Sequence, residues 1–335
     1  MTRRNPAGAR WWQAVLGIAV SVAMVWYAFR TTPFADVWSR ITAMRVVPML
    51  VGVVLATLSF PIRVPRWSIL LRREDGSAIP WQPLWHAIAM GFAANNILPL
   101  RLGEVLRIGA VSRLAPVPFP SALASVAVER VLDALTAVAL LAVALMVVDL
   151  PTATGLGRQA GTAGILGLVA LVGAIAVARW PRLATGPVRA VLPDTRLRSV
   201  LLGIIERLVS GLGALGDPRR AIPVVGWSIA LWLVNAAAFW AAFGAFGIDV
   251  SFAGAVIVQG ALLFGIALPS SPGYAGVFET VIMLTLQEFF GVPADIGLAY
   301  AITFHVCSFV PITLLGVWSL LTSGLSVRSL REAAT

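Results

Sequence analysis

Ionisable and amide side chains gather in three stretches of an otherwise apolar chain. The first stretch combines a helix-breaking proline and glycine with five candidate substrate-binding residues, Asn95, Asn96, Arg101, Glu104 and Arg107. Pro99 has no N–H and Gly103 tolerates unwound backbone, so we expect a helix break between them. A helix that starts after this break would favour an anion beside Arg101. Glu104 and Arg107 are also three residues apart, so they could instead neutralise each other.

The second stretch is Glu129-Arg130 with Asp133, near the start of an apolar run that continues to Val148. Glu129 and Asp133 are four residues apart and share a helix face, and Arg130 can reach Asp133. A charge at the bilayer centre costs about 3 kcal/mol on insertion scales, so such residues are functional candidates. Two interpretations stay open: an ion pair that fixes helix packing, or groups that couple to substrate or protons.

The third stretch contains two prolines and two glycines between residues 269 and 276, which cannot continue a helix. Its candidate substrate-binding residues are Ser270, Ser271 and Glu279. Glu279 enters the following apolar helix in its first turns, where an acid is electrostatically favoured. A plain external turn followed by an N-terminal acid would explain the same residues.

Isolated polar residues elsewhere are interpreted as interhelical hydrogen-bonding groups. They are His86, Asn235, Gln259, His305 and Cys307. Their spacing predicts no metal site, and the single cysteine excludes an internal disulfide. The sequence has no catalytic triad pattern and no phosphate-binding glycine loop, so we predict no catalytic residue, metal or cofactor.

The amino-acid composition indicates the class of protein in which these residues lie. Of 335 residues, 59% are hydrophobic and 12% charged, and the mean hydropathy is +0.89. Soluble domains carry about 25% charged residues, so a soluble enzyme and a disordered protein are excluded. All 25 basic residues are arginine, against 15 acids, for a net charge of +10. They lie between apolar runs rather than in one stripe, which indicates membrane topology and no nucleic-acid partner.

Six apolar runs are long enough to cross a bilayer, and two more are broken in the middle. The full runs are 11–29, 46–62, 121–148, 161–178, 222–246 and 296–321, and the broken ones are 85–111 and 252–290. No cleavage site follows the first run, so we interpret it as an uncleaved span rather than a signal peptide.

Arginine-rich segments place both termini, the 63–83 loop and the 179–220 loop in the cytoplasm. The arginine-poor loops 30–45 and 149–160 are then external. Each broken region must leave and return on one side, and each half has only about 12–18 residues, which is short for a full span and leaves full short spans as the alternative. Two re-entrant helical hairpins are therefore expected.

Span, broken hairpin and span occur in 46–148 and again in 222–321, with opposite starting sides. The predicted fold is an all-α polytopic membrane protein, with about six full transmembrane helices and two re-entrant hairpins in an inverted repeat. Inverted repeats with broken helices are typical of transporters. Residues 1–335 form a single transmembrane domain, which includes a cytoplasmic amphipathic helix at about 195–215.

Three motifs together resemble the lysylphosphatidylglycerol synthase transmembrane-region family, whose members are described as flippase-like. The motifs are Asn96-x-x-Pro99-x-Arg101-x-Gly103-Glu104-x-x-Arg107, Glu129-Arg130-x-x-Asp133 and Leu268-Pro269-x-x-Pro272-Gly273-x-x-Gly276-x-x-Glu279. Family members fused to a soluble aminoacyl-transfer domain make and translocate aminoacylated phosphatidylglycerol. This chain ends at Thr335 without such a domain, so the resemblance implies the translocating half.

We therefore expect a lipid flippase rather than an enzyme. Its partner would be a membrane lipid: an anionic or aminoacylated phospholipid, or a polyprenyl-phosphate carrier. Arg101 and Arg107 would hold the phosphate while the acids balance or couple charge. The alternatives are a membrane-embedded lipid-modifying transferase and a non-catalytic partner of a separate transferase, and a homo-oligomer is also compatible. The expected location is a bacterial inner membrane.

Overall fold

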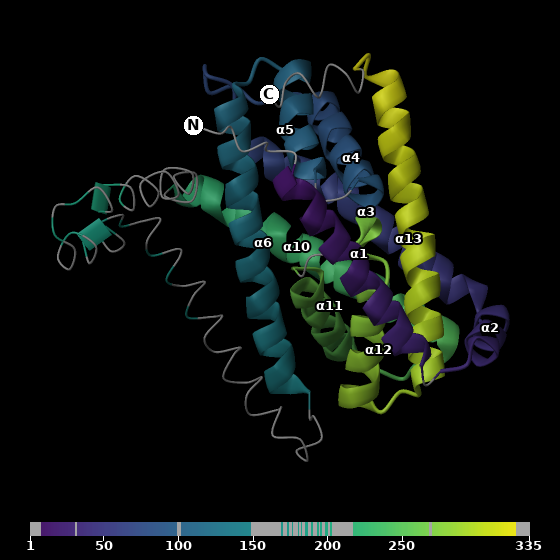
Figure 1. Ribbon diagram of the computed structural model, residues 1–335. Helices are drawn as coiled ribbons and strands as arrows, with labels where there is room; N and C mark the ends of the chain where they lie inside the picture. The colour runs from purple at the N-terminus through teal and green to yellow at the C-terminus, as the bar shows by residue number, and fades with distance from the viewer. Residues whose placement is uncertain are drawn as a thin grey trace.

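The computed structural model describes residues 8–30, 32–98, 102–148, 217–267 and 270–325, with isolated positions between 169 and 202. The elements within these ranges are helices. One isolated antiparallel β-bridge joins Arg72 and Ala78. The all-helical prediction is thus confirmed for the described part of the chain (Figure 1).

Four described helices are long and apolar enough to cross a membrane. They are α3 (Val46–Leu70), α6 (Phe119–Val147), α10 (Pro218–Phe243, continued by the 3-10 turn η4, Gly244–Phe246) and α13 (Ala294–Thr322). A bilayer core of about 30 Å requires about 20 helical residues, and each of these helices exceeds that length. The protein is a multi-pass membrane protein.

Helix α3 ends at Leu70 rather than at the predicted Ile62, and it runs through Pro61 and Pro65. The prediction was wrong here because it ended the helix at the first charge. Arg63 therefore belongs to the helix and not to a loop. A charged residue can continue an apolar helix when a neighbouring helix supplies its counter-charge, and α6 does so for Arg66 of α3, as described below.

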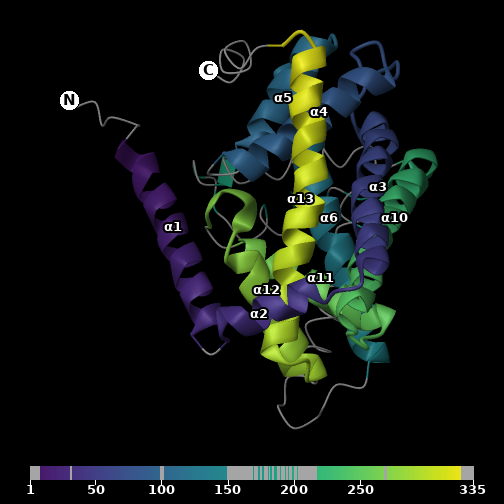
Figure 2. The same cartoon turned by 90° about the vertical axis from the view of Figure 1, so that its right-hand side faces the viewer.

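The first described helix is α1 (Gly8–Phe29), which includes the residues of the predicted first span, 11–29, and it is followed by α2 (Phe34–Thr42). The two helices are bent by 82° and would form a fifth candidate span if counted together. Helix α2 lies within the predicted external loop 30–45 and crosses beside α13 (Figure 2). Arg40 of α2 pairs with Asp295 of α13 at 2.8 Å.

Both broken regions form helix pairs. The first is α4 (Trp81–Ile97) with α5 (Gly103–Leu114), and the second is α11 (Phe252–Ala267) with α12 (Val277–Phe290), preceded by the turn η5 (Pro272–Tyr274). With 12 to 17 residues each, these helices are shorter than the about 20 residues of a typical full span. In Figures 1 and 2, α4 and α5 occupy the upper half of the molecule and α11 and α12 the lower half. Re-entrant placement and the inverted repeat stay predictions.

Two further predictions cannot be compared with the structure. The predicted span 161–178 and amphipathic helix 195–215 lie outside the described residues apart from isolated positions. The four described spans and the two helix pairs are nevertheless enough to position the polar residues considered below.

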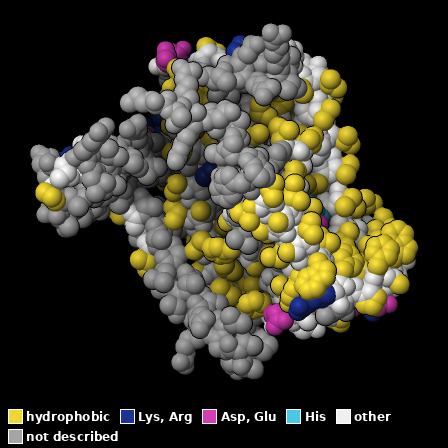
Figure 3. All heavy atoms as spheres, in the orientation of Figure 1, with side chains coloured by type: hydrophobic (Ala, Val, Ile, Leu, Met, Phe, Trp, Pro, Cys, Tyr) yellow, Lys and Arg dark blue, Asp and Glu magenta, His cyan; other side chains and the backbone are white. Residues whose placement is uncertain are grey.

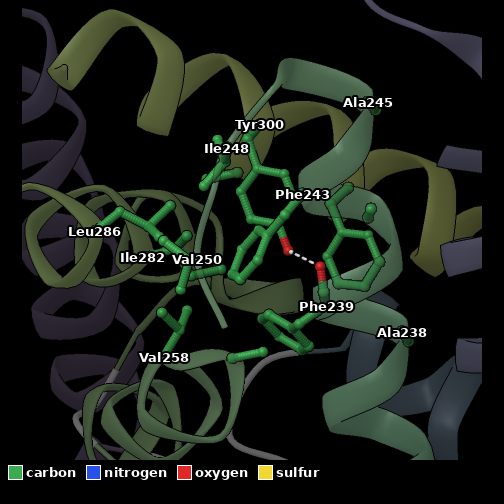
Figure 4. Packing of buried hydrophobic residues seen from close by; sticks show 14 of the residues in the cluster. Ala238, Phe239, Phe243, Ala245, Ile248, Val250, Val258, Ile282, Leu286 and Tyr300 are labelled. Carbon is green, nitrogen blue, oxygen red and sulfur yellow. Dashed lines mark hydrogen bonds between the residues drawn. The ribbon is translucent and has the colours of Figure 1, made fainter. Parts of the chain in front are cut away.

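The largest buried apolar cluster lies between α3, α10, α11, α12 and α13. The hydroxyl group of Tyr300 is buried there and donates a hydrogen bond to the carbonyl oxygen of Phe239 at 3.3 Å (Figure 4). This bond satisfies the polar end of a side chain that is otherwise surrounded by apolar groups. On the face shown in Figure 3, hydrophobic side chains dominate the described surface and charged side chains are sparse, as contact with lipid requires.

Helices α3 and α10 approach each other closely at Gly52. A Cβ atom at this position would lie 2.8 Å from the carbonyl oxygen of Ala238 and 2.8 Å from the Cβ atom of Ala242. Small residues that bring helix backbones together are a typical source of packing energy in membranes. Gly226 of α10, in contrast, has no atom within 4 Å of such a Cβ position.

We predict that Gly52→Ala lowers the free energy of unfolding by about 1–3 kcal/mol, because the added methyl group must push α3 and α10 apart. Gly226→Ala is the matched control and should leave stability unchanged or slightly raised, since alanine favours helix more than glycine does. Thermal unfolding in detergent measures both. Equal midpoints for the two variants would contradict the close contact.

Candidate functional site

An ion-pair network joins α3, α5 and α6 inside the helix bundle. We call its six members the ionic cluster: Arg66, Glu104, Arg107, Glu129, Arg130 and Asp133. Three arginines face three acids, so their formal charges cancel. The structure thus brings together five of the predicted site residues, from two motifs that are separated in the sequence.

Arg107 and Glu129 form the buried centre of the ionic cluster. The two terminal nitrogens of Arg107 donate to the two carboxylate oxygens of Glu129 at 2.7 and 2.9 Å, and both side chains are almost fully buried. The guanidinium lies 3.8 Å from the ring centre of Trp67, and that indole donates to the Ser125 hydroxyl at 3.0 Å. Arg107 therefore pairs with Glu129. It does not pair with Glu104, although their spacing of three residues would have allowed this.

Arg66 links the same carboxylate to a second acid and to a fourth helix. Its guanidinium lies 3.3 Å from Glu129 and forms a hydrogen bond with Asp133, so Glu129 and Asp133 share one face of α6, as predicted. It also donates to the Ser228 hydroxyl of α10 at 3.4 Å. The side chain of Arg66 is completely buried. These contacts compensate the cost of ionic groups inside the bundle.

One edge of the ionic cluster is accessible. Arg130 is 42% exposed and Glu104 29% exposed, and their charged atoms are 3.6 Å apart. Arg130 also pairs with Asp133 at 3.1 Å, the contact that the three-residue spacing predicted, and with Glu129. A charged group that reached the ionic cluster would meet Arg130 and Glu104 first.

Arg63 lies beside the ionic cluster and is a surplus cation. It has electrostatic interactions with Asp133 and Glu129, but it forms no ion pair or hydrogen bond within the described part of the chain. Its guanidinium lies 4.6 Å from the ring centre of Phe92 and 5.9 Å from that of Phe60. Aromatic faces stabilise a cation without neutralising it. Its charge thus remains available to an anion.

The break between α4 and α5 is closed by asparagine side chains. The carbonyl oxygen of Asn95 accepts the backbone N–H of Gly103 at 2.8 Å, at the start of α5. The amide group of Asn96 donates to the Thr313 hydroxyl of α13 at 2.9 Å. Arg101 lies in the break, outside the described residues, so its position relative to the ionic cluster stays a prediction.

The turn between α11 and α12 contacts both α1 and the first break. The backbone N–H of Ser271 donates to the Ser21 hydroxyl of α1 at 2.9 Å, and Ser270 is partly buried. A Cβ atom on Gly273 would lie 3.2 Å from the carbonyl oxygen of Asn96. The two breaks therefore meet, although no described contact joins Ser270 or Ser271 directly to the ionic cluster.

Glu279 lies in the first turn of α12 and has two partners. One carboxylate oxygen accepts the backbone N–H of Gly276 at 2.6 Å, and the other lies 2.5 Å from Nδ1 of His305 on α13. Helix capping by an acid explains the first contact. The second was not predicted, because His305 was interpreted as an isolated polar residue.

Three ionisable residues at these sites were missed or given another role by sequence reasoning. Arg63 and Arg66 were counted as topology signals, although their spacing of three residues on an apolar helix could have indicated one buried face. His305 is 26 residues from Glu279, and no local pattern connects them. In the described part of the chain, no group of three or more His, Cys, Asp or Glu side chains could hold a metal ion.

The sequence matches known proteins over most of its length. The family model described as "Lysylphosphatidylglycerol synthase TM region" matches residues 14–316, a range that contains all three motifs. The chain is also similar to Glycosyltransferase AglD of Haloferax volcanii, with 28% identity over 311 residues. That match covers 83% of this chain and 49% of the relative, so the chain spans about half the length of this curated protein.

We predict that Glu129→Gln destabilises the protein by about 3–5 kcal/mol, because it leaves the buried Arg107 and Arg66 without their shared counter-charge. Glu104→Gln is the matched control. Its carboxylate is partly exposed and 3.6 Å from its partner, so its loss should cost at most about 1 kcal/mol. Thermal unfolding in detergent compares the two, and equal destabilisation would argue against a buried Glu129.

Proposed function

This chain belongs to the lysylphosphatidylglycerol synthase transmembrane-region family, and from that premise we propose that it moves a lipid with an anionic headgroup between the two leaflets of a membrane. The headgroup would contact the ionic cluster and Arg63 while the acyl chains stay in the bilayer. The family and the helices make this a membrane protein connected with lipids. We choose an anionic headgroup because the region around the ionic cluster carries a net positive charge.

The surplus charge of Arg63 is the observation that carries the proposal. The ionic cluster balances three cations with three acids, so the unpaired guanidinium beside it makes the region net positive. The Nε–H groups of Arg63, Arg66 and Arg107 also lack acceptors among the described residues. A phosphate offers both the negative charge and the acceptor oxygens that these donors require.

The accessible edge suggests how a headgroup enters. Arg130 is the most exposed cation of the ionic cluster, and Glu104 next to it would repel a bare anion but attract an aminoacylated headgroup with an ammonium group. We also include Asn95 and Asn96, at the end of α4, in the proposed headgroup site, together with Arg101, whose position stays a prediction. Ser270 and Ser271 are included because the second break meets the first at Gly273.

The positive-inside rule supports an orientation for this site. The helices that carry the ionic cluster are connected to arginine-rich segments, which are expected in the cytoplasm. The ionic cluster would therefore face the cytoplasmic leaflet, with both termini cytoplasmic. A plasma membrane is the proposed location. The second hairpin would then enter from the opposite side.

The choice of test lipid follows from phosphate chemistry. Phosphatidylglycerol, its aminoacylated form and polyprenyl phosphates all present a phosphate beside an apolar anchor. The relative named as a glycosyltransferase suggests a saccharide-bearing lipid as a further test substrate. Covalent change of any of these lipids, detected by mass spectrometry, would instead favour the membrane-embedded transferase.

We predict that Arg63→Gln slows the movement of fluorescent phosphatidylglycerol in proteoliposomes about tenfold or more. A hydrogen bond to a charged group contributes about 1.5–3 kcal/mol, and each 1.36 kcal/mol is about tenfold in rate. Chemical quenching of the outer-leaflet fluorophore measures the rate. Arg63→Lys keeps the charge and should retain part of the activity.

Arg113→Gln is the matched control for this prediction. It also removes one arginine, but Arg113 lies in the last turn of α5, is exposed and is outside the ionic cluster. Its rate should equal that of the unmodified protein. No movement of any test lipid by the unmodified protein would overturn the proposed function, and equal rates for Arg63→Gln and Arg113→Gln would remove Arg63 from the headgroup site.

A further inference from the structure

An acid and a histidine form a second ionisable site that the proposed lipid site does not use. Glu279 of α12 and His305 of α13 are 2.5 Å apart, with side chains that are 15% and 9% exposed. His305 lies near the middle of a candidate membrane span. Ionisable residues at such a depth are functional candidates because they are costly to insert.

Aromatic rings hold the imidazole of His305 in place. Phe278 stacks on it with a centroid distance of 4.1 Å, and Phe309 contacts it edge-on at 4.2 Å. These rings restrict the imidazole to the orientation in which Nδ1 faces the carboxylate. Histidine is the side chain that ordinarily changes charge between about pH 5 and 8. The pair therefore combines a fixed geometry with a proton-binding group.

The same carboxylate holds the turn where the second hairpin meets the rest of the protein. Glu279 accepts the backbone N–H of Gly276, whose φ of +86° suits glycine. A Cβ atom there would lie 2.5 Å from the carbonyl oxygen of Ser21 in α1. This turn also contacts the first break through Gly273 and Asn96. A proton gained or lost at Glu279 and His305 would thus alter a bond at the junction of the two hairpins.

Other ionisable residues lie on the helices around Glu279 and His305. On the elements packed against α12 and α13, the remaining described ones are Tyr27 (α1), Asp36 and Arg40 (α2), Arg63 and Arg66 (α3), His86 (α4), Arg219 and Arg220 (α10), Tyr274 (η5), Glu288 (α12), and Asp295, Tyr300 and Cys307 (α13). Asp295 is paired with Arg40 at 2.8 Å, and His86 lies against Trp318. Cys307, Tyr274 and Tyr300 are the nearest in sequence, and tyrosine and cysteine ordinarily titrate above this pH range.

We propose that Glu279 and His305 form a proton-binding site through which lipid movement is coupled to a proton gradient. The pair takes up one proton from water on one side of the membrane and releases it to water on the other side during the transport cycle. This inference rests on the proposed function, because it requires that lipid moves. It assigns a coupling ion and a residue pair that are separate from the headgroup site.

The test measures the steady-state distribution of fluorescent phosphatidylglycerol in proteoliposomes with an imposed pH gradient. If one proton moves per lipid, a gradient of one pH unit is about 1.4 kcal/mol and produces about a tenfold difference between leaflets. A trapped pH-sensitive dye reports proton movement when a lipid gradient is imposed instead. We expect the unmodified protein to give both signals.

Two histidines make a matched pair of variants, because the chain contains only His86 and His305. His305→Gln should lose the tenfold lipid difference and the dye signal, while His86→Gln keeps both. Glu279→Gln is the second variant and should behave as His305→Gln does. Size-exclusion chromatography checks that each variant is folded.

The outcomes separate this inference from the proposed function. Lipid movement by the unmodified protein that ignores the pH gradient overturns proton coupling and leaves the proposed function intact. No lipid movement under any condition overturns both. A tenfold difference that persists in folded His305→Gln and Glu279→Gln shows that the proton binds elsewhere and overturns the assignment of this pair.

Discussion

The bidentate contact between Arg107 and Glu129 is the interaction on which the rest of the structure depends. Burying an isolated carboxylate in a bundle surrounded by lipid is prohibitively costly. Two guanidinium groups, from Arg107 and Arg66, compensate this cost at a single side chain of α6. Because those arginines come from α5 and α3, the electrostatic requirement of one acid determines how three helices are placed.

This requirement also explains why the first hairpin is broken. Helix α5 must present Arg107 to α6 and pack against α4 at the same time, and at Gly103 there is no room for a side chain. The break before Gly103 allows α5 to turn back beside α4, and Asn95 satisfies the backbone N–H that the break leaves free. Structure and proposed chemistry therefore use the same residues. A lipid headgroup would be recognised by charges that also hold the bundle together.

Much of the fold could be predicted from one sequence because apolar runs report helices directly. The bounds of α6, α10 and α13 lie close to the predicted spans, and the match to the family model confirms the resemblance that three motifs suggested. Helix α3 was predicted too short because charge was interpreted as the end of a span. Hydropathy counts the cost of an arginine but contains no information on a compensating acid in another helix.

The site was predictable only where partners are close in sequence. The shared face of Glu129 and Asp133, and the contact between Arg130 and Asp133, follow from helical periodicity. Helical periodicity does not predict that Arg107 pairs with Glu129 rather than with Glu104. It also does not predict that Arg63 is unpaired within the described structure, or that Glu279 contacts His305. The sequence by itself determined which residues are too polar for lipid and must find partners. Tertiary structure decided which partners they found, because distances between helices depend on packing that no local spacing contains.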